Sequence, residues 1–125
     1  MKQTIRRIYD FLLDDHEKFK DFKEGNKVGK YTVYGSGSEM MERFSKVFNK
    51  KTIHSACVLF GEYPFWHYES CTILYEVRSD KEIPNRPLCF GYLTVVGTKS
   101  NVEKVNTILI SSFPRIDDLV HEYEY

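Results

Sequence analysis

Residues 52–96 read TIHSACVLFGEYPFWHYESCTILYEVRSDKEIPNRPLCFGYLTVV, and this stretch decides the fold class. Segments 52–60, 71–77 and 88–96 are rich in β-branched and aromatic residues, which favour strands. Segments 61–70 and 79–87 carry glycine, proline and charged residues and are expected to be connections. The stretch therefore predicts three strands separated by two turn-rich connections.

Segment 71–77 shows the clearest strand pattern. Side chains alternate across a strand, so one face of this segment is expected to be apolar and the other half wet. The apolar face would carry Cys71, Ile73, Tyr75 and Val77. The opposite face would carry Thr72, Leu74 and Glu76. This division predicts a sheet that is covered on one side only.

The two flanking segments differ from it. Segment 52–60 ends in five residues that are apolar on both faces, which predicts a central strand buried on both sides or a short buried helix. Segment 88–96 places Leu88, Phe90, Tyr92 and Val96 on one face. Gly91 inside it indicates a bulge or a close approach of the backbone.

Two helices are expected before this stretch. Residues 3–23 carry Ile5, Ile8, Leu12, His16 and Phe19 at helical spacing. After a short strand at 27–34, with Tyr31 and Val33 facing inward, Ser36 and Glu39 have capping-box spacing and predict a helix to about Lys50. Its apolar face would be Met40, Met41, Phe44, Val47 and Phe48.

The end of the chain allows two interpretations. Ser100 and Glu103 have capping-box spacing before a helical stripe, but residues 107–110 also resemble a strand. A helix over 101–111 is favoured, followed by a short terminal helix on Ile116, Leu119, Val120 and Tyr123. The predicted architecture is one α+β domain over 1–125, with an antiparallel sheet of about four strands covered by helices.

Composition narrows the class of protein. The chain has 29% charged and 15% aromatic residues, which is a globular composition. No signal peptide and no apolar run of roughly 20 residues is evident, so no membrane association is expected. Cys57, Cys71 and Cys89 are expected to be reduced, and the compartment cytoplasmic.

Charge is balanced overall but uneven. Residues 1–51 hold 12 basic and 8 acidic side chains, whereas residues 52–125 hold 6 and 10. Neither part has the basic density of a phosphate-binding surface, so nucleic acid is an unlikely partner.

Catalytic and metal sites are not evident. His67, Glu69 and Cys71 alternate and could face a zinc ion together, but no convincing fourth ligand follows. None of the cysteines has a histidine base in a suitable position. No catalytic residue, metal or cofactor is therefore predicted.

The Gly35-Ser36-Gly37-Ser38 turn is the candidate ligand site. Free N–H groups at the start of a helix favour an anion such as a phosphate. The turn lacks the third glycine of a dinucleotide loop and the Gly-Lys-Ser/Thr of a P-loop. A flexible turn with a helix cap explains the segment fully, without a ligand.

The connection after residue 60 is the candidate partner surface. A loop that carries four aromatic rings is unusual, and aromatic anchors are frequent where proteins bind partners. The alternative is that these rings pack together over the sheet edge. The predicted partner-binding residues, including an acidic group near the end of the chain, are Tyr63, Phe65, Trp66, His67, Tyr68, Asp117, Asp118 and Glu122.

The leading hypothesis is a non-catalytic protein-binding module of unknown oligomeric state. The small α+β layout without a catalytic set is typical of inhibitor or immunity proteins that block a toxin or an enzyme, by analogy of layout alone. The alternative hypothesis is a small-ligand binder or an enzyme with an anion or nucleotide pocket near Gly35–Ser38.

Overall fold

A computed structural model describes residues 3–13, 25–48, 54–58, 61–80 and 88–125. Eight strands, two α-helices and a short 3₁₀ turn lie within these ranges. The strands are β1 (Thr4–Leu13), β2 (Lys27–Val28), β3 (Tyr31–Tyr34), β4 (His54–Val58), β5 (Gly61–Tyr68), β6 (Cys71–Asp80), β7 (Leu88–Thr98) and β8 (Val120–Glu124). The helices are α1 (Gly37–Val47) and α2 (Lys99–Ser112), and the 3₁₀ turn is Ile116–Asp118.

The strands form one mixed sheet in the order β2-β3-β1-β7-β6-β5-β4. Strand β8 pairs antiparallel with residues 5–9 of β1, and β3 pairs parallel with residues 12–13 of the same strand. Every other pair is antiparallel. The α+β class is confirmed, but the prediction of an antiparallel sheet of about four strands is wrong, because β1 and β8 were expected to be helical.

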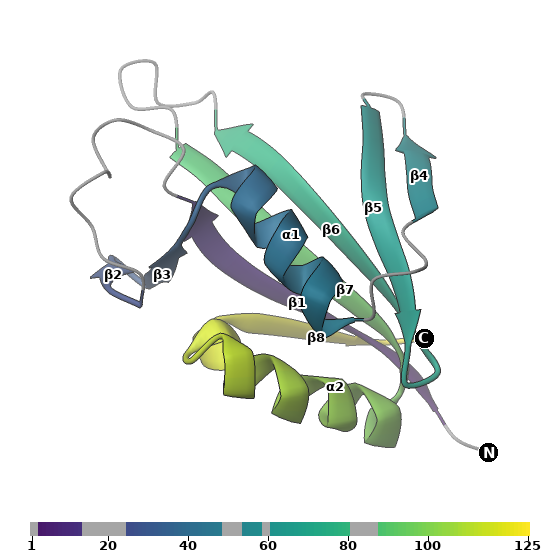
Figure 1. Ribbon diagram of the computed structural model, residues 1–125. Helices are drawn as coiled ribbons and strands as arrows, with labels where there is room; N and C mark the ends of the chain where they lie inside the picture. Colours follow the sequence, from purple (N-terminus) through teal and green to yellow (C-terminus); the bar gives the residue numbers. More distant parts are fainter. Residues whose placement is uncertain (1–2, 14–24, 49–53, 59–60, 81–87) are drawn as a thin grey trace.

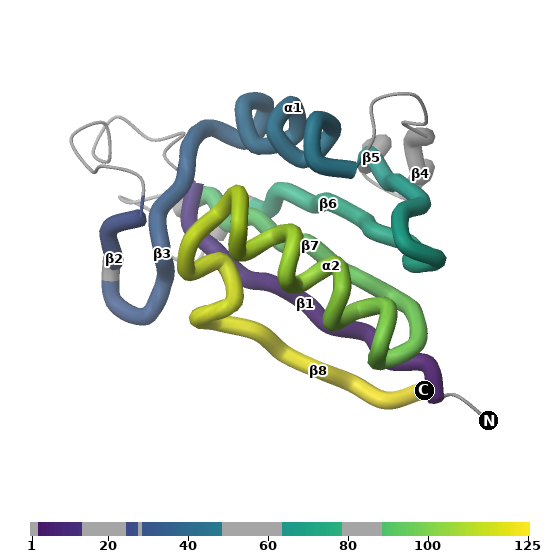
Figure 2. Tube along the Cα trace, turned by 60° about the horizontal axis from the view of Figure 1, so that its bottom comes forward, coloured from purple at the N-terminus to yellow at the C-terminus, as the bar shows by residue number. Residues whose placement is uncertain are grey.

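Both helices cover the same face of the sheet (Figures 1 and 2). The core beneath them is aromatic, with Phe44 of α1 at its centre against the rings of Phe113, Tyr75 and Trp66. Met40 and Phe44 of α1 and its C-cap residue Phe48 are buried, as predicted, whereas Met41, predicted on the same face, is exposed. Val102, Val105 and Leu109 are buried on α2. In β6, Cys71, Ile73 and Tyr75 point into this core. The one-sided cover predicted from segment 71–77 is therefore confirmed for these three residues, whereas Val77, predicted on the same face, is exposed.

Gly91 of β7 lies directly opposite Phe11 of β1 in the antiparallel pair that these two strands form. A Cβ atom at this position would lie only 2.2 Å from the Phe11 ring, so the ring occupies the space that glycine leaves. The close approach predicted from the sequence is present.

The opposite face carries a smaller apolar cluster at one end. Leu12 of β1, Val33 of β3 and Phe90 of β7 are buried there. Tyr31 and Tyr92 pack against them, and the Tyr31 and Phe90 ring centroids are 5.0 Å apart. No helix within the described residues covers the remainder of this face, which is the open face below.

The helix predicted over residues 3–23 is wrong where the structure describes the chain. Residues 4–13 form β1. This strand has β7 on one side, and β3 and β8 pair with different parts of its other side. The segment fits both periods: Ile5, Tyr9 and Phe11 alternate as a strand, whereas Ile5, Ile8 and Leu12 are spaced as a helix. Pairing along ten residues of β7 decides for the strand. His16 and Phe19 lie outside the described residues.

Three further expectations differ from the structure. Segment 52–60 does contain a strand, β4, but it is at the edge of the described sheet and not at its centre. Most of the 61–70 connection is strand β5. The predicted terminal helix is the 3₁₀ turn followed by β8, whose pairing with β1 supplies backbone hydrogen-bond partners that a sequence pattern does not reveal.

The two helices after residue 36 are confirmed. Ser36 caps α1, since its Oγ accepts a hydrogen bond from the Glu39 N–H at 3.2 Å. Helix α2 was expected to begin with a capping box at Ser100, but it begins after Thr98, which makes no side-chain cap. Across the described ranges, neither helix is long and apolar enough to span a membrane.

Candidate functional site: a hollow on the open face

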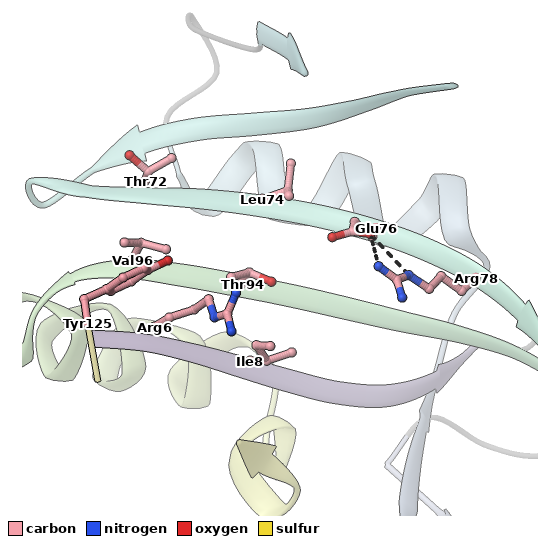
Figure 3. Close-up of a pocket in the computed structure, with 9 residues that line it drawn as sticks. All are labelled: Arg6, Ile8, Thr72, Leu74, Glu76, Arg78, Thr94, Val96 and Tyr125. Atoms are coloured by element: carbon pink, nitrogen blue, oxygen red, sulfur yellow. Dashed lines mark hydrogen bonds and ion pairs between the residues drawn. The ribbon is translucent and has the colours of Figure 1, made fainter. Parts of the chain in front are cut away.

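The open face contains a hollow of about 370 Å³, floored by the central strands (Figure 3). Its side chains come from β1, β6 and β7 and from the residue after β8. They are Arg6, Ile8, Thr72, Leu74, Glu76, Arg78, Thr94, Val96 and Tyr125. Three apolar side chains, three hydroxyl groups and three charged groups thus share one concave surface.

Arg6 lies at one end of the hollow. Its guanidinium carbon is 4.9 Å from the ring centroid of Tyr123 and 6.0 Å from that of Tyr125. Both tyrosines come from the β8 end, which pairs with β1 so that Tyr123 lies opposite Arg6. Among the described residues, Arg6 has no carboxylate within ion-pair distance, and its buried Nε has no hydrogen-bond partner. Two tyrosine rings therefore hold a cation whose charge is not matched.

Arg78 lies at the other end and is matched. Its Nη2 and Nε donate hydrogen bonds to Glu76 Oε2 at 2.8 and 3.2 Å. Its guanidinium carbon is also 5.4 Å from the centroid of the Tyr92 ring. Since the Arg78 and Glu76 charges cancel, the side chains that line the hollow have a net charge of one positive unit, located at Arg6.

Arg7, in contrast to Arg6, has carboxylate partners within this fold. It lies on the helix-covered face, where its guanidinium donates to Glu103 of α2 and to Glu122 of β8, the latter at 2.7 Å from Nη2. Burial opposes the charged form, but the hydrogen bonds that the guanidinium donates to both carboxylates outweigh it and raise the pKa of Arg7. Nearby, Tyr9 donates to Asn106 Oδ1 at 2.7 Å, and burial raises the pKa of Tyr9 to about 12.

Asp10 lies on the open-face side of β1, two residues beyond Ile8. Its Oδ2 is 3.9 Å from His121 Nε2, and its buried Oδ1 has no hydrogen-bond partner among the described residues. Burial raises the pKa of this carboxyl, and the nearby charges of His121 and Lys30 lower it in part. Asp10 is thus a poorly solvated carboxylate beside the hollow.

The predicted aromatic surface is divided by the strand β5. Trp66 is fully buried against Phe44 and Phe48, so it is not an exposed anchor, and Tyr68 packs on Phe48 from the same face. Phe65 and His67 lie on the opposite face, with their rings 5.6 Å apart. The prediction that the rings sit in a loop is wrong, because alternation along a strand sends neighbours to opposite faces. The side chain of Tyr63 lies outside the described residues.

The predicted acidic group lies elsewhere and is paired internally. Asp118 is 2.7 Å from Lys27 Nζ, Glu122 accepts from Arg7, and Asp117 is half-buried in the 3₁₀ turn. Strands β1, β7 and β6 separate this end from β5. The structure therefore does not join the two predicted halves of the partner surface, and a partner role for their exposed members stays a prediction.

The Glu39 side chain occupies the space beside the Gly35–Ser38 turn. A Cβ on Gly35 would come within 2.3 Å of Glu39 Oε2, so the Glu39 carboxylate already lies at the start of α1. Gly37 O accepts a hydrogen bond from Tyr75 Oη at 2.9 Å. An incoming anion would meet the Glu39 carboxylate, so this geometry does not favour the anion site considered from the sequence.

The residues considered for a metal or a nucleophile do not converge. A turn at Glu69 and Ser70 follows β5, so His67 faces the open side whereas Cys71 is buried in the core. Burial raises the pKa of the Cys71 thiol, with Glu69 adding to the effect. Cys71 and Cys89 are free thiols, and the side chain of Cys57 is not described. In the described ranges, no three metal-ligating side chains gather.

The lining of the hollow was not predicted, apart from the shared face of Thr72, Leu74 and Glu76. Arg6 lies in the range 3–23 that was expected to be helical, and Tyr125 was not among the predicted partner-binding residues. The available signal was the alternation Arg6, Ile8, Asp10 along β1, which marks one face of a strand.

Comparison with family models, curated proteins and solved structures finds no match to this chain. The open face is therefore the basis of the function proposed below.

Proposed function

We propose that this chain is a non-catalytic protein-binding module that takes its partner on the open face of the sheet. The observation that carries the proposal is the hollow, in which half-buried apolar side chains adjoin arginine and tyrosine. Tyrosine and arginine are enriched at the centre of protein interfaces, where a few such residues supply most of the binding energy.

The polar side chains of this face contact one another in the free protein. Arg6 stacks on Tyr123 and Tyr125, and Arg78 is held between Glu76 and Tyr92. Association costs about 0.5–1.5 kcal/mol for each flexible side chain that becomes fixed. Rings and guanidinium groups that hold one another in the free protein reduce this cost, which supports a preformed binding surface.

A catalytic role has less support. The contact closest to a nucleophile and its base is Thr72 Oγ1 to His67 Nδ1 at 3.4 Å, which is long for a hydrogen bond. No carboxylate among the described residues is hydrogen-bonded to this ring to orient it. The inhibitor or immunity role rests on the small α+β layout by analogy and is the finer part of this proposal.

Small-ligand binding is the second candidate function. The hollow is a better candidate site for a small ligand than the Gly35–Ser38 turn is. Its volume of about 370 Å³ lies within the range of about 300–1,000 Å³ typical of ligand pockets. Its rim is open, since the Arg78 side chain is 64% exposed, so a bound small molecule would remain largely in contact with water. This shape favours the protein partner.

The test compares two matched surface variants in affinity capture from source cells. Leu74→Arg places a charge in the hollow, and Ile110→Arg places the same charge on the exposed side of α2. We expect the parent and Ile110→Arg to retain one specific protein and Leu74→Arg to lose it, with all three folded by circular dichroism. Capture that survives Leu74→Arg, or a parent that captures nothing specific, contradicts the proposal.

A further inference from the structure

The inference concerns Arg6 and rests on the proposed function. Arg6 is the one charged group lining the hollow that has no opposite charge beside it within the described part of the chain. Its neighbour in the sequence, Arg7, pairs with the carboxylates of Glu103 and Glu122, and Arg78 pairs with Glu76. A cation that is partly removed from water and left unpaired is costly, and a hydrogen-bonded carboxylate offsets that cost.

The surroundings of Arg6 also limit what can pair with it. Two tyrosine rings lie 4.9 and 6.0 Å from the guanidinium carbon, and the Arg6 side chain lines the hollow, so an anion can reach it from within the hollow. There the Thr94 hydroxyl can hydrogen-bond the second oxygen of a carboxylate, and Val96 and Ile8 offer apolar contact (Figure 3). At the far end, Glu76 keeps Arg78 occupied and repels a second negative charge.

We propose that Arg6 binds one carboxylate in the hollow, and that this carboxylate belongs to an aspartate or glutamate side chain of the protein partner. An apolar residue lies beside that acidic residue in the partner. Charge complementarity selects a single acidic group, because Arg6 is the one lining side chain whose positive charge has no carboxylate partner among the described residues. The apolar neighbour covers Ile8, Leu74 and Val96. A phosphate, with about two negative charges, would exceed the single available cation.

The direct test uses a blocked dipeptide, N-acetyl-Glu-Leu-amide, titrated into the ¹⁵N-labelled protein and followed by NMR. The control probe is N-acetyl-Gln-Leu-amide, which differs by the charge alone. We expect the Glu peptide to shift the resonances of Arg6, Thr94 and Val96 and to bind at least about tenfold more tightly, a difference of about 1.4 kcal/mol. Equal binding of the two peptides, or shifts centred elsewhere, overturns the inference.

Variants and a smaller probe identify the residue and the source of the carboxylate. Arg6→Gln should abolish the preference for the Glu peptide, whereas Arg115→Gln, the same change at an exposed position outside the hollow, should leave it intact. Sodium acetate should bind more weakly than the Glu peptide, because it lacks the apolar part. Acetate binding as tight as that of the peptide would assign the hollow to small anions and would overturn the proposal that the carboxylate belongs to a protein side chain.

The capture experiment separates this inference from the proposed function. If Leu74→Arg loses the partner and Arg6→Gln retains it at parental affinity, protein binding stands and the anchor role of Arg6 falls. If neither variant changes capture, the proposed function falls as well. We expect Arg6→Gln to weaken partner binding by at least about tenfold and to reduce its dependence on salt.

Discussion

Arg6 and Arg7 are consecutive residues of β1, and because side chains alternate along a strand they lie on opposite faces of one sheet. On the helix-covered face, α2 and β8 bring two carboxylates to Arg7. On the open face, the same β8 brings tyrosine rings to Arg6 and no carboxylate in the described residues does so. One face is completed within the chain, and the other retains a charge that a partner can match.

The largest expected difference between the faces is in packing. Trp66→Ala should reduce the free energy of unfolding by about 3–5 kcal/mol, because the indole is fully buried against Phe44 and Phe48. Phe65→Ala, its neighbour on the open face, should cost about 1 kcal/mol or less. Urea denaturation of both variants measures the difference, and equal losses would show that the open face is packed as tightly as the covered one.

Gly91→Ala tests the contact between β7 and β1 on the covered face. The added methyl group would lie 2.2 Å from the nearest atom of the Phe11 ring, so we expect a loss of about 1–3 kcal/mol. A double-mutant cycle with Phe11→Leu should show that the smaller side chain recovers part of this loss. Additive effects in thermal or urea denaturation would mean that the ring is not the obstacle.

The two arginines give a direct test of the comparison. Arg7→Met should cost about 1–3 kcal/mol, because it removes hydrogen bonds to two carboxylates and leaves them without their partner. Arg6→Met should change stability by less than about 1 kcal/mol, because no such partner exists among the described residues. Its effect should appear in partner binding instead. A larger stability loss at Arg6 than at Arg7 would reverse our assignment of which arginine is structural.

The smallest expected effect is the pH dependence at Asp10. Because burial raises the pKa of this carboxyl, the folded state takes up a proton at a higher pH than the unfolded state does. Stability is therefore lost as the pH rises from about 4 through the folded pKa. Asp10→Asn should be slightly more stable than the parent at pH 7, and the difference should shrink as the pH falls below about 4, where the carboxyl is protonated in both states. A difference that does not vary with pH would contradict this account of Asp10.

The sequence by itself determined the elements whose local signals agree. Ser36, Glu39 and the stripe around Phe44 predicted α1, since the cap and the apolar period both belong to the same residues. The alternation of 71–77 predicted β6 and showed which side of the sheet is covered. Gly91 indicated the close approach that Phe11 makes.

Only the tertiary structure decided the segments whose signals conflict. Residues 4–13 fit the period of a helix as well as that of a strand. The segment around Trp66 was expected to be a connection because it contains glycine, proline and charged residues. Backbone pairing with β7 and with β6 settles both as strands. The hollow follows from that pairing, since Arg6, Leu74 and Thr94 become neighbours only when β1, β6 and β7 align. Register between strands distant in sequence is a property of the whole sheet, so no single segment encodes it.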